Sequence, residues 1–217
     1  MMDLIFPRKC LFCEKILSKQ ELDLCESCRE DAEIFPDVKN SLSFVAGWCA
    51  IWYYKGNVRQ GILRYKFYGR RNRGKNFGRL LAMKLLQSEL TNYDILTWVP
   101  LSSAKLRKRG YDQVEQVGKA VAKELGIPLT PTLKKVRDTS TQSTLETLDA
   151  RRANVMGAYV VTDPEQIKDK RILLLDDVIT TGATASECAK TLLLSGAKEV
   201  YCAALAAIHP DKKQNYR

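Results

Sequence analysis

ILLLDDVITTGAT, residues 172–184, places four apolar residues before two adjacent carboxylates and then gathers small hydroxylated residues around one glycine. The apolar run predicts a buried strand, and the segment after it carries Cys188, Leu192 and Ser195 at helical spacing. The run EVYCAALAA that follows predicts another buried strand. A strand, a helix and a strand of these lengths indicate a βαβ unit of a parallel sheet, in which ligands bind beyond the carboxyl ends of the strands. We therefore expect a ligand site at residues 176–184.

The chemistry of this loop favours a phosphorylated sugar. Gly182 allows backbone N–H groups to converge, and the next helix would begin there with the positive end of its dipole. Further donors are the hydroxyls of Thr180, Thr181 and Thr184. Asp176 and Asp177 would repel a phosphate, so we expect them to bind vicinal sugar hydroxyls or a hydrated Mg²⁺. The alternative is a strand-end loop whose acids and threonines only cap the backbone.

This motif resembles the signature of type I phosphoribosyltransferases, where it holds the ribose 5-phosphate part of phosphoribosyl pyrophosphate. The matching residues are Asp176, Asp177, Thr180, Thr181, Gly182, Ala183 and Thr184. The resemblance implies that residues 180–184 hold the 5-phosphate and that the two acids act at the ribose as the catalytic pair. It also implies that Mg²⁺ accompanies the substrate.

The chain as a whole has room for one ordinary domain and an appendage, since it has 217 residues and 45% hydrophobic content. No apolar run approaches the roughly 20 residues that span a bilayer. The first ten residues have few apolar side chains before Pro7, which is unlike a secretory signal. We therefore expect a cytoplasmic protein.

Four of the seven cysteines form two ordered pairs, CLFC and CESC. These are Cys10, Cys13, Cys25 and Cys28. Two Cys-x-x-Cys turns can close a tetrahedron of thiolates around a structural Zn²⁺, with iron–sulfur ligation or redox use as alternatives. A redox pair would explain one such motif but not two. Cys49, Cys188 and Cys202 stand in apolar contexts and are expected to be small core residues.

The net charge of +10 is concentrated in residues 38–88, which contain 11 Lys and Arg, nine aromatic residues and no Asp or Glu. Cations interleaved with rings are typical of a sequence-tolerant single-strand binder. The densest part, YGRRNRGKNFGR, makes Arg70, Arg71, Arg73 and Lys75 the candidate nucleic-acid contacts. Two alternatives stay open: the rings belong to a core, or the cations serve a small anionic substrate.

Further elements follow along the chain. We expect a strand at residues 44–54, a helix at about residues 75–89 and a second strand in YDILTWVP. Asp112 is expected to cap another helix, with Glu115 three residues later as in a capping box. The cations before that helix would lie in a loop at a strand end, where they could bind pyrophosphate. They are Lys105, Arg107, Lys108 and Arg109.

Residues 134–155 are polar, rich in Thr and Ser, and without a convincing period. Such a segment predicts either a lid whose cations close on a pyrophosphate leaving group or a solvated surface loop.

Taken together, the paired cysteines, VPLSSAKLRKRGYDQ, TQSTLETLDARRANV and LLLDDVITTGAT resemble the ComF family, a phosphoribosyltransferase-like group associated with natural competence. The second motif usually reads Arg-Gly-Phe-Asn-Gln in that family; this chain has Tyr111 for Phe and Asp112 for Asn. The Asp adds a negative charge near the expected anion loop.

The resemblance implies an α/β fold, a type I phosphoribosyltransferase-like parallel sheet flanked by helices, with a four-cysteine zinc ribbon at residues 1–34 and the main domain at residues 35–217. It further implies a role with incoming single-stranded DNA and with competence or recombination proteins. Two hypotheses follow: a phosphoribosyl pyrophosphate-binding protein of DNA uptake, or an active phosphoribosyltransferase of nucleotide salvage or another pathway that transfers ribose 5-phosphate to a base or amine.

Overall fold

The computed structural model describes residues 7–36, 42–139 and 148–208. Within these residues the main sheet has four parallel strands in the order β1-β6-β5-β2. The strands are β1 (Gly47–Tyr53), β2 (Ile95–Trp98), β5 (Arg171–Ile179) and β6 (Glu199–Ala207). The helices are α1 (Glu26–Asp31), α2 (Gly56–Phe67), α3 (Arg73–Gln87), α4 (Ser103–Arg109), α5 (Gln113–Leu125), α6 (Leu148–Val155) and α7 (Ala183–Leu194). A small antiparallel pair, β3 (Leu133–Lys135) and β4 (Tyr159–Val161), and a 3₁₀ turn (Pro164–Gln166) lie outside the main sheet.

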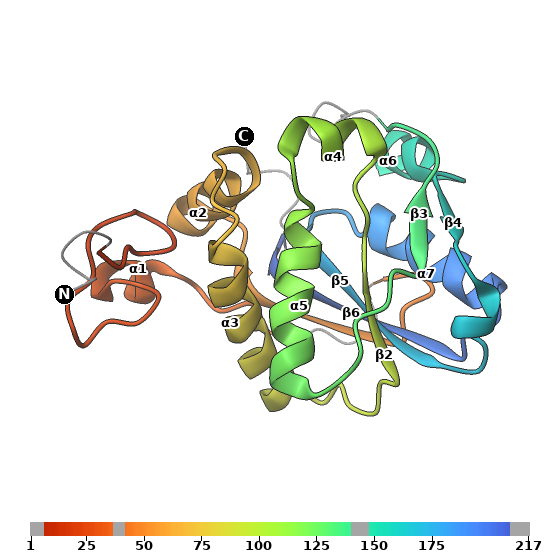
Figure 1. Cartoon of the computed structure of the whole chain (residues 1–217), viewed down its shortest axis with the longest axis horizontal. Helices are drawn as coiled ribbons and strands as arrows, with labels where there is room; N and C mark the ends of the chain where they lie inside the picture. The colour runs from red at the N-terminus through yellow and green to blue at the C-terminus, as the bar shows by residue number, and fades with distance from the viewer. Residues whose placement is uncertain (1–6, 37–41, 140–147, 209–217) are drawn as a thin grey trace.

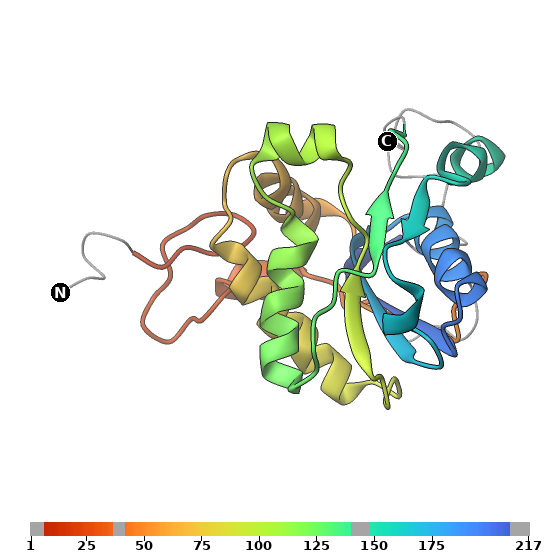
Figure 2. The ribbon, with the colours of Figure 1, turned by 45° about the vertical axis from the view of Figure 1, so that its right-hand side comes forward.

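Helices cover both faces of the main sheet: α3 and α5 lie on one side and α7 on the other (Figure 1 and Figure 2). The side chains of β5 show why. Leu173 and Leu175 belong to the apolar cluster that α3 and α5 complete, whereas Ile172 and Leu174 belong to the cluster that α7 completes. Successive strand residues point to opposite faces, so a continuous apolar run can bury both. The predicted βαβ unit is confirmed.

The helix that follows β2 and α4 begins as its sequence predicts. Oδ1 of Asp112 accepts hydrogen bonds from the backbone N–H groups of Val114 and Glu115, at 2.9 and 3.3 Å. Gly126 ends α5 in the left-handed conformation, with φ of 68°. In a capping box the Glu115 carboxylate would turn back toward the N-cap backbone; here it pairs with Lys119, whose Nζ lies 2.6 Å away.

Four helices lie where the sequence predicted none: α1, α2, α4 and α6. α2 occupies the basic run after β1, and its buried residues Val58, Ile62 and Tyr65 have the spacing of one helical face. α4 holds the four cations that were expected in a loop. The strand predicted at residues 172–175 is longer than expected, because β5 stays paired with β6 as far as Ile179.

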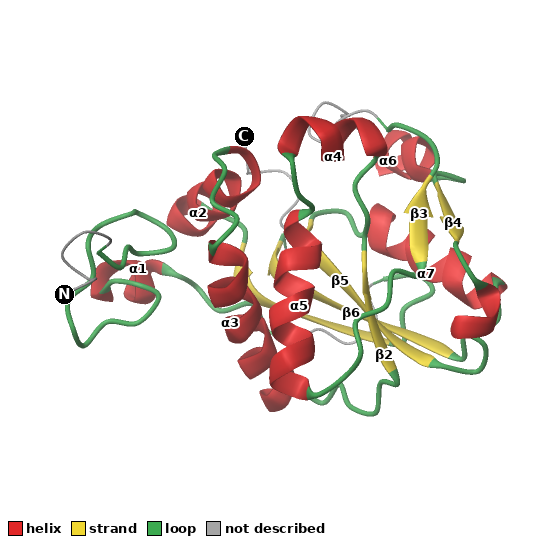
Figure 3. Cartoon of the chain, viewed as in Figure 1, coloured by secondary structure: helices red, strands yellow, loops and turns green. Residues whose placement is uncertain are grey.

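The N-terminal segment is mostly loop around the short helix α1 (Figure 3), yet it does not fold apart from the sheet. Phe12 is fully buried, with its ring centroid 5.1 Å from that of Trp52 and 6.5 Å from that of Phe77. Ile34 forms a bridge to Trp52 on the edge of β1. The division at residues 34 and 35 stays a prediction, since the two parts share one apolar cluster.

The remaining cysteines, Cys49, Cys188 and Cys202, are buried in the core as expected. None of the helices in the described part of the chain combines the length and hydropathy of a bilayer-spanning segment.

Candidate functional site

The two acids of the signature lie inside β5, near its carboxyl end. Asp176 pairs in register with Ala204 of β6, and its Oδ1 accepts the backbone N–H of Asp177 at 2.7 Å. Since side chains alternate along a strand, Asp177 lies on the face of α2 and α5, and Asp176 lies on the face of α7. The expectation that both follow the strand was wrong in this detail. The acids therefore flank the sheet end from two sides.

Asp177 is held by side chains from two helices. Nζ of Lys66 lies 2.8 Å from its Oδ1, and Nε2 of Gln113 donates to its Oδ2 at 2.8 Å. The side chains of Lys66 and Asp177 are 18% and 10% exposed. The ion pair and the hydrogen bond, one to each carboxylate oxygen, fix the direction of this side chain.

Asp176 has a different environment. Burial, and next the charge of Asp177, raise its pKa from 3.8 to about 8, although Lys66 opposes the change. Lys135, at the end of β3, adds a cation whose pKa is lowered to about 8 by burial and next by the charge of Lys105. Its Nζ lies 5.2 Å from the ring centroid of Tyr159. Near neutral pH, one carboxyl of the acidic pair is therefore largely protonated.

The hydroxylated loop forms the turn between β5 and α7. Gly182 has φ of 77°, a conformation that favours glycine, and α7 begins at the next residue. Oγ1 of Thr181 accepts the backbone N–H of Ala183 at 3.3 Å. The loop surrounds a small hollow lined by Asp176, Val178, Ile179, Thr180, Gly182, Thr184 and Ala185. An acid, hydroxyls and a helix N-terminus thus meet in one hollow.

The four expected pyrophosphate cations do not act as one group. Lys105 is half-buried and lies close enough to Lys135 to influence its charge. Arg109 donates to Oε1 of Gln113, and its guanidinium carbon lies 5.0 Å from the ring centroid of Phe67. Arg107 and Lys108 are exposed on α4. Because these cations lie on a helix and not in a loop, they are not gathered around one anion site.

The two departures from the family motif have structural roles. The hydroxyl of Tyr111 donates to the backbone carbonyl of Tyr65 at 2.7 Å. Asp112 caps α5 and also accepts the backbone N–H of Leu101 at 2.9 Å, and burial raises its pKa. The oxygens of Asp112 therefore face backbone amides, which offsets the charge that it adds.

A basic groove of about 900 Å³ lies between the turn before α3 and helix α5. It is lined by Gly69, Arg70, Arg71, Asn72, Lys75, Gln116, Lys119, Ala120, Lys123 and Glu124. The groove brings Arg70, Arg71 and Lys75 together as the sequence predicted. Lys119 and Lys123 were not anticipated, because they lie more than 40 residues further along the chain. Their spacing of four residues within α5 is the signal that they share a helix face.

Arg73 requires a correction. It is 7% exposed, its Nη1 donates to the carbonyl of Leu11 at 3.1 Å, and its Nη2 lies 2.7 Å from Oε1 of Glu14. Acids of the N-terminal segment meet other cations of the basic run in the same way: Glu14 pairs with Arg70 at 3.2 Å, and Asp23 pairs with Arg79. Part of the positive charge therefore joins the two parts of the protein.

Most of the rings in the basic run also belong to the core. Trp48, Trp52, Tyr65 and Phe77 are buried, as the alternative interpretation held. Phe67 and Tyr68 differ, with exposures of 63% and 71%, and they lie at the end of α2 just before the groove.

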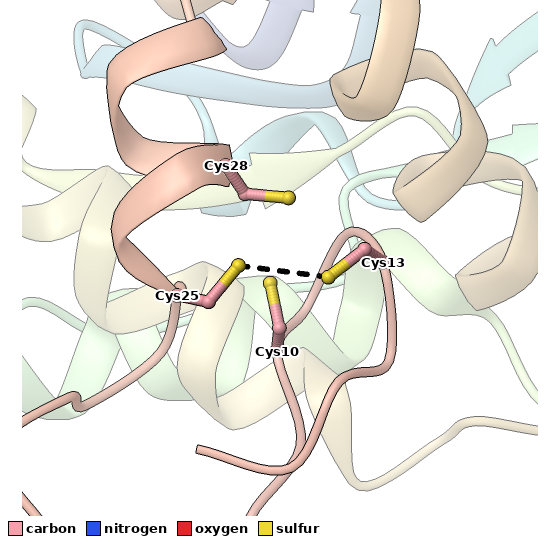
Figure 4. A group of neighbouring side chains, drawn as sticks. All are labelled: Cys10, Cys13, Cys25 and Cys28. Atoms are coloured by element: carbon pink, nitrogen blue, oxygen red, sulfur yellow. Dashed lines mark hydrogen bonds between the residues drawn. The ribbon is translucent and has the colours of Figure 1, made fainter. Parts of the chain in front are cut away.

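The four paired cysteines meet at one point (Figure 4). Their Sγ atoms all lie within 4.8 Å of one another, and those of Cys13 and Cys25 are 3.6 Å apart. Zn–S bonds of about 2.3 Å in a tetrahedron place sulfurs about 3.8 Å apart, so the cluster fits Zn²⁺. The second motif differs from the expected turn, because Cys28 lies on α1 and Cys25 is its N-cap.

Comparison with known proteins identifies both parts of the chain. Residues 115–217 match the phosphoribosyl transferase domain, and residues 1–38 match the double zinc ribbon domain. Competence protein F of Haemophilus influenzae is 27% identical over 93% of this chain and 97% of its own length. Competence protein ComFC of Streptococcus pneumoniae is 30% identical over 70% of this chain, and DNA utilization protein YhgH of Salmonella typhimurium is 31% identical over 65%. This chain covers 64% of the length of each of these last two.

Among solved structures, the glutamine phosphoribosylpyrophosphate amidotransferase from B. subtilis, complexed with ADP and GMP, is 22% identical over 66% of this chain and 30% of its own, with a TM-score of 0.46. The two domain matches and the four-cysteine cluster define the protein as a phosphoribosyltransferase-like domain behind a structural zinc ribbon. It belongs to the ComF family of competence proteins.

The residues that the sequence analysis did not single out as site residues are mainly partners of the acids. Lys66 and Gln113 come from two different helices, and only the fold brings them to Asp177. Lys135 was among the cations of the expected lid, and the fold places it close enough to Asp176 for the two charges to interact. Gln113 stood in the quoted family motif, which was the available signal. The expected lid is described only at its ends, β3 and α6, where Arg137 donates to the carbonyls of Asn154 and Met156 at 3.1 and 2.6 Å. Residues 140–147 lie outside the described part of the chain.

Proposed function

We propose that this protein binds phosphoribosyl pyrophosphate with Mg²⁺ at the carboxyl end of β5 and takes part in processing incoming single-stranded DNA. The observation that supports binding of this ligand is the hollow beside Asp176. Threonine hydroxyls and a glycine turn lie there at the start of the 12-residue helix α7. The printed names of the relatives, which concern competence and DNA utilization, support the second half.

In this proposal the loop at residues 180–184 holds the 5-phosphate, and Asp176 and Asp177 bind the ribose hydroxyls. Lys105 and Lys135 face the pyrophosphate. Mg²⁺, when bound, neutralises part of the pyrophosphate charge. If the bond to pyrophosphate breaks, positive charge develops at the anomeric carbon, and a carboxylate fixed by Lys66 and Gln113 stabilises it without reorganising.

Calorimetric titration of phosphoribosyl pyrophosphate in excess Mg²⁺ tests the site. We expect wild-type protein to bind, Asp177→Ala to lose at least tenfold in affinity, and Asp169→Asn, a remote exposed acid, to bind like wild type. Absence of binding to wild-type protein at millimolar ligand would refute the proposal. Release of pyrophosphate in the presence of bases or amines would identify the active-transferase alternative.

The basic groove supports single-stranded DNA as a second ligand. Its walls carry five cations, Arg70, Arg71, Lys75, Lys119 and Lys123, against one acid, Glu124. The exposed rings of Phe67 and Tyr68 offer stacking surfaces close to one end, and cations beside such rings suit a sequence-tolerant single-strand binder. Competence or recombination proteins are proposed as partners in the same process.

Fluorescence anisotropy of a labelled oligonucleotide over a salt series tests the groove. Each phosphate contact contributes about −0.7 to the slope of log affinity against log salt for single strands. Lys75→Ala should therefore weaken binding at all sequences and flatten the slope by about 0.7. Lys168→Ala, an exposed cation elsewhere, should leave the slope unchanged. Binding that does not respond to salt would refute this role.

A cytoplasmic location completes the proposal. It rests on the four-cysteine cluster, which requires reduced thiols to hold a metal.

A further inference from the structure

The ion pair on Asp177 depends on where helix α2 lies. Lys66 stands in the last turn of α2, and its Nζ is 2.8 Å from Oδ1 of Asp177. Asp177 belongs to the sheet, whereas Lys66 moves with α2. A contact that fixes the position of α2 therefore also fixes the position of Lys66 beside Asp177.

The first cysteine knuckle is what α2 packs against. Leu11 and Phe12 stand between the metal ligands Cys10 and Cys13. A Cβ at Gly61, in the middle of α2, would lie 2.6 Å from Cδ1 of Phe12 and 2.9 Å from the carbonyl oxygen of Leu11. No side chain larger than that of glycine fits this contact without a shift.

Hydrogen bonds fix the same contact. Arg64 of α2 donates to the carbonyl of Phe12, and Arg73 at the start of α3 donates to the carbonyl of Leu11 at 3.1 Å. Both acceptors lie in the two-residue link between the ligands. A metal bound by Cys10 and Cys13 would hold that link at both of its ends.

The distance from the knuckle to the acid is short. Gly61 and Lys66 are five residues apart, which is about 7.5 Å along a helix axis. Tyr65, the neighbour of Lys66, is fully buried and donates to the carbonyl of Gln113 at 2.6 Å, and Gln113 is the second partner of Asp177. A shift of α2 would therefore disturb both partners of Asp177.

We propose that the metal-loaded knuckle positions Lys66 on Asp177 through α2, so that the zinc ribbon controls the assembly of the ribose-phosphate site. Lys66 acts as a positioning residue: it fixes the direction of the carboxylate that meets the ribose. This inference rests on the proposed function for its ligand, but the mechanical link between ribbon and sheet does not.

Linkage provides the test. If the metal and phosphoribosyl pyrophosphate favour the same arrangement, each must strengthen the binding of the other. We expect Mg²⁺ with phosphoribosyl pyrophosphate to strengthen Zn²⁺ binding several-fold in wild-type protein, measured as slower and less complete transfer of Zn²⁺ to a colorimetric chelator. The slowing should disappear in Lys66→Met, return in part in Lys66→Arg and persist in Lys168→Met. Cobalt-substituted protein, whose thiolate absorption reports the ribbon, should show the same spectrum in all four proteins.

Hydrogen exchange separates the two possible failures. After chelation we expect amides in the last turn of α2 to exchange at least tenfold faster, while those in the middle of α7 keep their rates. If α2 responds in this way but wild-type protein never binds phosphoribosyl pyrophosphate, the proposed function fails and the mechanical link stands. If the ligand binds but neither Zn²⁺ release nor α2 exchange responds, the inference is overturned and the function stands.

Discussion

Binding of Mg²⁺ and phosphoribosyl pyrophosphate near pH 7 should release close to one proton from Asp176. Burial and the neighbouring charge of Asp177 raise the pKa of this carboxyl to about 8. With that pKa, roughly 0.9 of the molecules carry the proton at pH 7 and roughly 0.1 at pH 9. Mg²⁺ nearby, or ribose hydroxyls that donate to both carboxyl oxygens, favour the ionised form of this carboxyl, so the proton leaves when the ligand binds.

Calorimetric titration in two phosphate-free buffers of different ionisation enthalpy measures this release. At pH 7 the two apparent enthalpies should differ by about 0.9 times the difference between the buffer enthalpies, after the same titration without protein is subtracted. At pH 9 the difference should nearly vanish, and the apparent affinity should rise as pH increases toward 8. Asp176→Asn should bind without proton release, whereas Asp169→Asn should match wild type.

Equal enthalpies in the two buffers at pH 7 would refute this reasoning. They would mean that Asp176 is already ionised in the free protein or that it stays protonated in the complex. In either case the acidic pair would not be the group that couples binding to pH.

Three further predictions concern folding and the loop. The raised pKa of Asp176 means that the folded state holds this proton more tightly than the unfolded state does, so the group's contribution to stability falls as pH rises from about 4 to about 8. Asp176→Asn should therefore raise the free energy of unfolding in urea by about 1 to 3 kcal/mol at pH 8 and by less at pH 5. Gly78→Ala should lower it by about 1 to 3 kcal/mol, because the new Cβ would lie 2.5 Å from Cβ of Ala120 where α3 meets α5; an unchanged urea midpoint would contradict the close approach. Gly182→Ala, with φ of 77° and a Cβ placed 2.1 Å from Cδ2 of Leu42, should lower stability by about 1 to 2 kcal/mol and weaken phosphoribosyl pyrophosphate binding in the same titration.

Local signals in the sequence predicted several elements well. The apolar run before Asp176 and the glycine turn after it predicted the order β5, α7, β6, because period and turn chemistry act over a few residues. Asp112 predicted the start of α5 through its side-chain oxygen. The spacing of the cysteines predicted one cluster, since two ligands with two residues between them can bind the same metal ion.

Other features could not be derived from local signals. The helix α2 was missed, because its basic residues and two glycines hide the spacing of Val58, Ile62 and Tyr65. The basic run was partly misread, because Glu14 and Asp23 lie more than 50 residues before Arg73 and Arg79, the cations that they pair with.

The sequence by itself determined the chemistry available to this protein: a hydroxylated loop after two acids, four thiols at metal spacing and an excess of cations. Only the tertiary structure decided which of these groups are paired, buried or exposed. It placed Asp176 and Asp177 on opposite faces of a strand and gave Asp177 a cation from α2. It also buried Arg73 against the zinc ribbon and left Lys75 facing the groove. The physical reason is that motifs depend on neighbours along the chain, whereas charge pairing and burial depend on neighbours in space.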